Sequence, residues 1–355
     1  MPGRLVEGAN LRKHHLLRHL KTIALVILTA AILWRLWRGL NWSEVRLSLS
    51  RASLLLLGAA FIVSCITNLI RACRWRALLE PLAAAEIPEV FAATNIGLGS
   101  TFLFGTALGE LIRPLSLSLL SPKIRRSAAF LTIVGERVCD VAVVVILFGL
   151  SFFWLPTYSG RVLQSSHARE IGLLLLALPV LAVAILFLVN RRLSRATSRL
   201  SERTAQWELT SNPVRRTILR ITHQLMHAVT LLTSRRTLLV VITWTTIQWL
   251  SIILTTWLTL RAFGMSFGIK ESILVMCCGL VGSLVPTPGG AAGAFHAAIS
   301  SGLIFLGATV DQAAAISIVS HLLGYVPALI LGSYYLLRWN VNIAQLQEQV
   351  SAVAE

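Results

Sequence analysis

The hydrophobic residues of this 355-residue chain gather into long runs separated by short polar stretches. Six of these runs are close to the roughly 20 residues that a helix needs to cross a bilayer. They span 22–40, 52–70, 127–150, 171–189, 237–262 and 312–337. The pattern predicts an all-α polytopic membrane protein with six full transmembrane helices.

Two further apolar regions, 90–121 and 271–309, are interrupted near their middle by glycine or proline. Such breaks end one helix and begin another, so we predict that both regions are re-entrant helical hairpins. The alternative for the second region is a short external loop between two complete spans. The candidate hairpin-break residues are Gly105, Gly109, Pro286, Pro288, Gly289, Gly290 and Gly293.

Basic residues are distributed unevenly around these runs. The formal net charge is +17, and arginine is concentrated in the N-terminal segment 1–21 and in the loop 191–236. The positive-inside rule places both segments in the cytoplasm, together with the tail 338–355. It also favours a hairpin at 90–121 that enters from the cytoplasm, because a single crossing there would move the basic loop outside.

The end of the second span carries another group of basic and aromatic residues. Arg71, Arg74, Trp75 and Arg76 follow the run 52–70. Arginine and tryptophan are common at membrane–water interfaces. We therefore expect these side chains to form an anchor at the cytoplasmic border.

The resulting topology predicts two halves with the same order of elements and opposite orientation. Membrane repeat 1 is 22–150 and membrane repeat 2 is 171–337, with an external loop at 151–170 between them. The hairpins "GLGSTFLFGTALGE" (97–110) and "GLVGSLVPTPGGAAG" (279–293) also resemble each other weakly. Inverted repeats with broken helices recur in transporters, and a helix N-terminus at the midplane favours an anion such as phosphate.

Ionisable residues at membrane depth form two candidate clusters. Glu110 and Arg113 are three residues apart, which places them on one helix face where they can neutralise each other. Glu136 and Asp140 are four apart with Arg137 beside them, so two acids and one base require a cation from elsewhere. Such residues are costly in a membrane. A structural salt-bridge network and a substrate or proton site are both open interpretations.

Histidine adds two further candidates. His296 lies in the second hairpin and His321 in the last span, and each is either an interhelical hydrogen-bond partner or a functional group. Motifs of known enzyme classes are weak by comparison. A serine protease using Ser100 and His321, or a lipid transferase using Glu110 or Glu136 as base, is a minor alternative. We expect no catalytic residues, cofactor or metal.

Four motifs in order resemble a known family. They are "RACRWRALL" (71–79), "GELIRP" (109–114), "ERVCDV" (136–141) and "PTPGGAAGAFHAA" (286–298). Their order is similar to that of the flippase-like membrane family that includes the transmembrane region of lysylphosphatidylglycerol synthases. The resemblance implies an integral inner-membrane protein that moves, or helps to move, a polar lipid between leaflets.

The resemblance also implies site residues and shows departures from the family pattern. By it, the hairpin acid and base and the charged patch of the next helix are substrate-binding candidates: Glu110, Arg113, Glu136, Arg137 and Asp140, with His296 at the second hairpin. His296 stands where the family commonly has glutamate, after an extra alanine. The first hairpin lacks the proline that often precedes the glycine–glutamate pair. These changes put a shared ion-coupling chemistry in doubt.

The sequence therefore predicts a flippase or transporter for a phosphate-bearing polar lipid in a bacterial inner membrane, with both termini in the cytoplasm. Arg113 or Arg137 would hold the phosphate. The alternative is a non-catalytic membrane partner of an envelope lipid-modifying enzyme. The expected partners are a membrane lipid with an anionic headgroup and anionic inner-leaflet lipids at the loop 191–236; we expect no nucleic acid.

Overall fold

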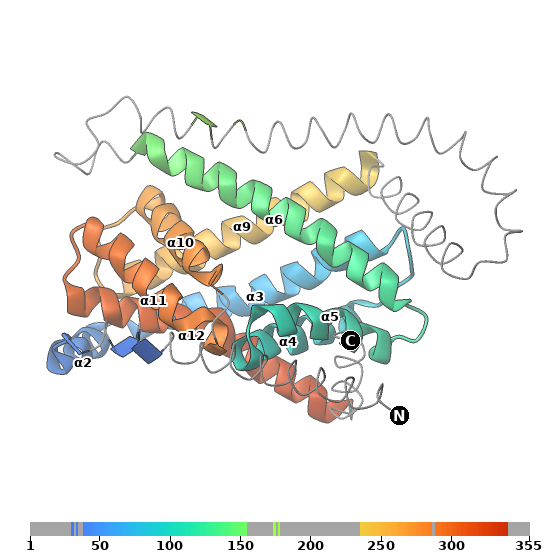
Figure 1. Cartoon of the computed structure of the whole chain (residues 1–355), viewed down its shortest axis with the longest axis horizontal. Coiled ribbons are helices and arrows are strands. Elements are labelled where there is room, and N and C mark those ends of the chain that lie inside the picture. The colour runs from blue at the N-terminus through green and yellow to red at the C-terminus, as the bar shows by residue number, and fades with distance from the viewer. Residues whose placement is uncertain are drawn as a thin grey trace, which may run out of the picture.

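The computed structural model of the protein describes residues 38–154, 235–285 and 288–339, with a few single positions within 30–34 and 173–177. Within these ranges the chain forms helices and no strands (Figure 1). The helices are α2 (Trp42–Arg51), α3 (Leu54–Leu79), α4 (Ile87–Phe104), α5 (Thr106–Leu120), α6 (Arg126–Trp154), α9 (Arg235–Ala262), α10 (Ile269–Ser283), α11 (Pro288–Phe305) and α12 (Val310–Arg338).

Four long helices coincide with predicted hydrophobic runs. α3, α6, α9 and α12 have between 26 and 29 residues each. Among the described residues, three helices are both long and apolar enough to cross a membrane: Leu54–Leu79, Arg236–Ala262 and Val310–Arg338. These helices support the prediction of a helical membrane protein. α2 was not predicted; it begins at an Asn41 cap and contacts α12.

Several predicted segments lie outside the described residues, wholly or in large part. They are the N-terminus 1–21, the spans 22–40 and 171–189, the external loop 151–170, the basic loop 191–236, the tail 338–355 and Pro286.

The two glycine-interrupted regions form pairs of short helices. α4 and α5 pack against each other and are joined at Gly105, whose φ is 89°. α10 and α11 pack in the same way, and α11 opens with Gly289 at φ 71° and Gly290 at φ 62°. In Figure 1 α10 and α11 lie toward the left and α4 and α5 toward the right, and the two pairs meet where α11 packs against α4. Backbone with positive φ is where glycine is favoured, which explains the position of both turns.

The other predicted break residues have different positions. Gly109 lies inside α5 and Gly293 inside α11. A Cβ atom at Gly109 would collide with Thr101 of α4, so this glycine permits the close packing of the first helix pair. Pro288 is the first residue of α11, a position where a helix tolerates proline.

The long helices α3 and α9 run side by side in opposite directions. The backbone nitrogen of Ser53 donates to the carbonyl of Ala262 at 2.8 Å, so the start of α3 meets the end of α9. Farther along, the Thr67 hydroxyl donates to the Ser251 hydroxyl at 2.9 Å. This register brings the second half of α3 beside the first half of α9.

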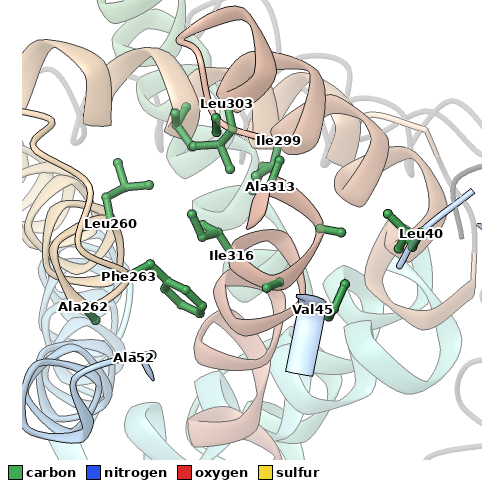
Figure 2. Close-up of a cluster of buried hydrophobic side chains, with 14 residues drawn as sticks. Leu40, Val45, Ala52, Leu260, Ala262, Phe263, Ile299, Leu303, Ala313 and Ile316 are labelled. Carbon is green, nitrogen blue, oxygen red and sulfur yellow. The ribbon is translucent and has the colours of Figure 1, made fainter. Parts of the chain in front are cut away.

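An apolar core fills one end of the bundle. Figure 2 shows Leu260 of α9, Phe263 directly after that helix, Ile299 and Leu303 of α11, and Ile316 of α12 packed together. A second apolar cluster lies at the end of α3 around Trp75 and includes residues of α4, α5 and α6. The charged residues of α3, α5 and α6 lie beside this second cluster.

Candidate functional site

Glu136 of α6 is the centre of a buried charged cluster. Its side chain is fully excluded from solvent and accepts two hydrogen bonds from Arg113 of α5, at 2.5 and 3.3 Å. Arg74 of α3 approaches the same carboxylate at 3.4 Å. Because an unpaired buried carboxylate is very costly, two guanidinium groups around one acid are a strong constraint on how α3, α5 and α6 pack.

Asp140 lies one turn beyond Glu136 and binds the two Nη atoms of Arg74, whose Nε faces Glu136. The two Arg74 Nη atoms donate to the two Asp140 oxygens at 2.6 and 3.1 Å, a bidentate pair. Arg137 also contacts Asp140, at 3.0 Å. The predicted cation from elsewhere is therefore confirmed, and it comes from both Arg74 and Arg113.

Arg137 differs from the other two arginines because its side chain is 46% exposed. It bridges Asp140 to Glu110 of α5, which it approaches at 3.4 Å. The second oxygen of Glu110 is buried and has no hydrogen-bond partner in the described part of the chain. This side of the cluster retains an unused acceptor next to an accessible cation.

The predicted pairing of Glu110 with Arg113 is wrong. The two residues are correctly spaced on α5, but Arg113 binds Glu136 and Glu110 binds Arg137. The fully buried Glu136 gains more from the guanidinium than does Glu110, whose side chain is 27% exposed and keeps some contact with solvent. Helix spacing alone cannot reveal this choice, since the competing acid belongs to another helix.

The predicted interfacial anchor at the end of α3 is also corrected. Arg74 and Trp75 are buried, and Arg76 is the exposed member of the group. Trp75 donates its indole N–H to Thr132 at 2.9 Å, and the Arg113 guanidinium lies over its ring at 4.1 Å. α3 continues to Leu79, which carries these residues into the helix bundle instead of leaving them at its border.

Arg71 is a further member of the cluster, although the hydrophobic pattern placed it at the membrane border. It lies one turn before Arg74 and within electrostatic range of Asp140. Within the described part of the chain it has no ion pair closer than 4 Å and no hydrogen bond, and its Nε atom is buried without a partner. The three-residue spacing of Arg71 and Arg74 is the sequence signal that would have indicated a shared face.

A second polar group lies at the turn that opens α11. The carbonyl of Gly290 lies 3.2 Å from His321 Nε2 and accepts a longer bond of 3.4 Å from the Tyr325 hydroxyl. His296 is buried, its Nδ1 lies 3.2 Å from the Ser317 hydroxyl, and its ring centroid is 4.9 Å from that of His321. Both histidines therefore make interhelical contacts between α11 and α12.

The same stretch of α12 also contacts the first helix pair. The ring of Phe102, three residues before the Gly105 turn, lies 5.8 Å from the ring of His321 and 5.5 Å from that of Tyr325. The two turns thus approach one segment of α12 from different elements. Of the predicted site residues, the structure brings Glu110, Arg113, Glu136, Arg137 and Asp140 together, while His296 lies with the second group.

The two arginines that contact Asp140 are expected to differ in their contribution to stability. Arg74→Gln removes a buried bidentate partner and should lower the free energy of unfolding by about 3–5 kcal/mol. Arg137→Gln removes a half-exposed partner and should lower it by less than about 1 kcal/mol. Unfolding by SDS titration in mixed micelles measures both. Equal losses in the two variants would contradict the difference in burial.

A family model described as the transmembrane region of lysylphosphatidylglycerol synthase matches residues 22–332. No curated protein and no solved structure matches the chain. The match covers every charged residue of the cluster and both helix turns, which are the features from which the motifs were drawn. With this extent of the match and its helical architecture, the chain belongs to the family of the lysylphosphatidylglycerol synthase transmembrane region.

Proposed function

We propose that the protein translocates a phosphate-bearing polar lipid between the leaflets of a bacterial inner membrane and that it is a transporter and not an enzyme. The observation that carries the proposal is the charged cluster, held within α3, α5 and α6. Charged groups inside membrane helices are rare and commonly mark a substrate pathway. Membership of a lipid-related membrane family supports a lipid as the substrate.

The arrangement of helices supports an inverted repeat with two re-entrant hairpins. α3, α4, α5 and α6 have the same succession of long, short, short and long helices as α9, α10, α11 and α12. Helix contacts follow this correspondence: α4 packs on α12, and its counterpart α10 packs on α6. At 1.5 Å per residue, α5 and α10 are about 22 Å long, less than the roughly 30 Å hydrocarbon core.

The charges favour a ligand site over a purely structural network. In the alternative, a membrane partner of an envelope enzyme, the buried charges would pair only with one another. Glu136, Arg74 and Arg113 do pair in this way. Arg71 has no such partner among the described residues, which leaves one guanidinium to meet a headgroup.

The proposed mechanism gives different roles to the arginines with buried ion pairs and to Arg71 and Arg137. The ion pairs of Arg74 and Arg113 hold α3, α5 and α6 together. Of the two phosphate ligands that the sequence suggested, Arg113 and Arg137, we therefore retain Arg137. Arg71 and the half-exposed Arg137 face the headgroup while the acyl chains stay in lipid. Movement of one repeat against the other would expose the cluster to each leaflet in turn. Phe102 and Tyr325 lie where the first turn meets α12, at a contact that such a movement would change.

A cross-linking experiment tests whether this movement carries lipid. Phe102→Cys and Tyr325→Cys are introduced together into protein whose five native cysteines are replaced, and the protein is reconstituted in vesicles with a fluorescent phospholipid. A short thiol cross-linker that a reductant can release should reduce translocation to the rate of protein-free vesicles. Reductant should restore it.

Each single-cysteine variant, treated with the same reagent, is the control and should translocate lipid at its untreated rate. Unchanged translocation in the cross-linked double variant would argue against movement at this contact. If the wild-type protein does not accelerate translocation of any phospholipid, the transport function is contradicted and the partner role takes its place.

A further inference from the structure

Arg71 is the one guanidinium of the cluster that lacks an ion-pair partner within the described ranges. Arg74, Arg113 and Arg137 each have a carboxylate oxygen within 3.4 Å. Arg71 has none within 4 Å among the described residues, which distinguishes it from the other three; its buried Nε, like those of Arg74 and Arg113, donates to no acceptor there. A buried donor without a partner is costly, so the site favours a ligand that supplies an acceptor.

The surroundings of Arg71 are positively charged. Arg74, Arg113 and Arg137 all lie within electrostatic range of it, and Asp140 is the nearby acid. The cluster as a whole holds four guanidinium groups against the three carboxylates of Glu110, Glu136 and Asp140. Among the described residues, one positive charge therefore remains without a counterion in a medium of low dielectric constant.

Arg71 also lies near the contact between the helix turns. The hydroxyl of Tyr325 is within electrostatic range of Arg71 and donates to the carbonyl of Gly290 at the second turn. Tyr325 packs against Phe102 beside the first turn. A group bound by Arg71 would therefore lie in the region of the α12 segment that both turns approach.

We propose that Arg71 binds the phosphodiester of the transported lipid and that this lipid has a net negative, hydroxyl-bearing headgroup. The inference rests on the proposed translocation function. One phosphodiester supplies the single missing negative charge, and guanidinium suits its oxygens. A headgroup hydroxyl would donate to the unpartnered oxygen of Glu110. A lysyl ester adds ammonium groups, makes the headgroup net positive and is disfavoured by the surplus charge of the cluster.

Competition between lipids tests this selectivity without requiring transport. Purified protein is incubated with equal amounts of phosphatidylglycerol, phosphatidylethanolamine and lysylphosphatidylglycerol, and the retained lipids are counted by native mass spectrometry. Wild-type protein should retain phosphatidylglycerol about tenfold over each of the others, a ratio typical of one charge-assisted contact. Arg71→Gln should abolish the preference.

Two further variants separate the ligand role from folding. Arg71→Lys keeps the charge and should keep the preference for the anionic lipid in reduced form. Arg261→Gln changes an exposed arginine near the end of α9, away from the cluster, and should behave as the wild type. Equal retention of the three lipids by wild-type protein, or a preference that survives in Arg71→Gln, would overturn the inference.

A soluble phosphodiester could bind Arg71 through the same contacts as a lipid headgroup. Glycerophosphoglycerol added in excess distinguishes these two ligands. Displacement of retained lipid by millimolar concentrations of this soluble headgroup would show a site for free solutes and overturn the lipid assignment. Selective retention combined with no translocation in vesicles would keep the Arg71 site and contradict the proposed transport. Translocation without selective retention would keep the proposed transport and contradict the Arg71 site.

Discussion

Replacement of Glu136 by glutamine is expected to destabilise the protein by about 3–5 kcal/mol, the range for breaking a buried ion pair by removing one partner. The carboxylate is fully buried and holds Arg113 through two hydrogen bonds and Arg74 through one longer ion contact of 3.4 Å. Glutamine keeps the shape but lacks the charge, and its amide N–H group would face the guanidinium donors. Unfolding in mixed micelles, followed by tryptophan fluorescence, measures the loss.

Glu80→Gln is the matched control, because Glu80 is exposed directly after α3. It should change the free energy of unfolding by no more than about 0.5 kcal/mol, as is usual for surface substitutions. The double variant Arg113→Met, Glu136→Gln should recover part of the loss by removing one stranded cation. A Glu136→Gln protein as stable as the Glu80→Gln protein would contradict the assigned ion pairs.

Gly290→Ala is expected to be the second large effect, at about 2–5 kcal/mol from backbone strain and overpacking together. Gly290 has a φ of 62°, and a Cβ atom there would lie 2.8 Å from two ring carbons of Tyr325. The substitution therefore strains the turn and displaces the ring that bonds the Gly290 carbonyl. The same unfolding titration detects it, and loss of translocation should accompany it.

Two neighbouring substitutions separate these causes. Gly289 has a similar φ of 71°, but its nearest side-chain neighbour, the Ala292 Cβ, is 3.5 Å away, so Gly289→Ala should cost only the left-handed backbone, about 1–2 kcal/mol. Gly58 lies within α3 with nothing within 4 Å, so Gly58→Ala should stabilise the helix by about 0.5–1 kcal/mol. If Gly289→Ala lowers the free energy of unfolding as much as Gly290→Ala does, the collision with Tyr325 does not contribute to the loss.

The long helices were predictable because a bilayer allows few solutions. Backbone groups in hydrocarbon must be satisfied within the segment, so an apolar run of sufficient length predicts a helix. α9 and α12 agree with their predicted runs within two residues at each end. α3 extends beyond its run because Arg71 and Arg74 interrupt the hydrophobic pattern without interrupting the helix. In the sequence alone, charged residues that neighbouring helices bury cannot be distinguished from charged residues at a membrane border.

The hairpin turns could also be located from residue type. Gly105, Gly289 and Gly290 adopt positive φ, which other residues rarely do, so a glycine-rich break is a local signal. Gly109 gave the same signal and is helical, because its missing side chain serves a close contact with Thr101. Local sequence does not distinguish a glycine needed for its backbone from one needed for its size.

The amino-acid sequence by itself determined where the long helices lie, where two shorter apolar regions break, and that Glu136 and Asp140 need cations from elsewhere. The tertiary structure alone decided which cations: Arg74 is 66 residues from Asp140, and Arg113 is 23 residues from Glu136. It also decided that Arg71 has no ion-pair partner among the residues that the structure describes. Each acid pairs with the cation that helix packing brings to it, and burial makes that choice costly to change. Spacing along one helix therefore predicted the need for partners, while the contacts among α3, α5 and α6 selected them.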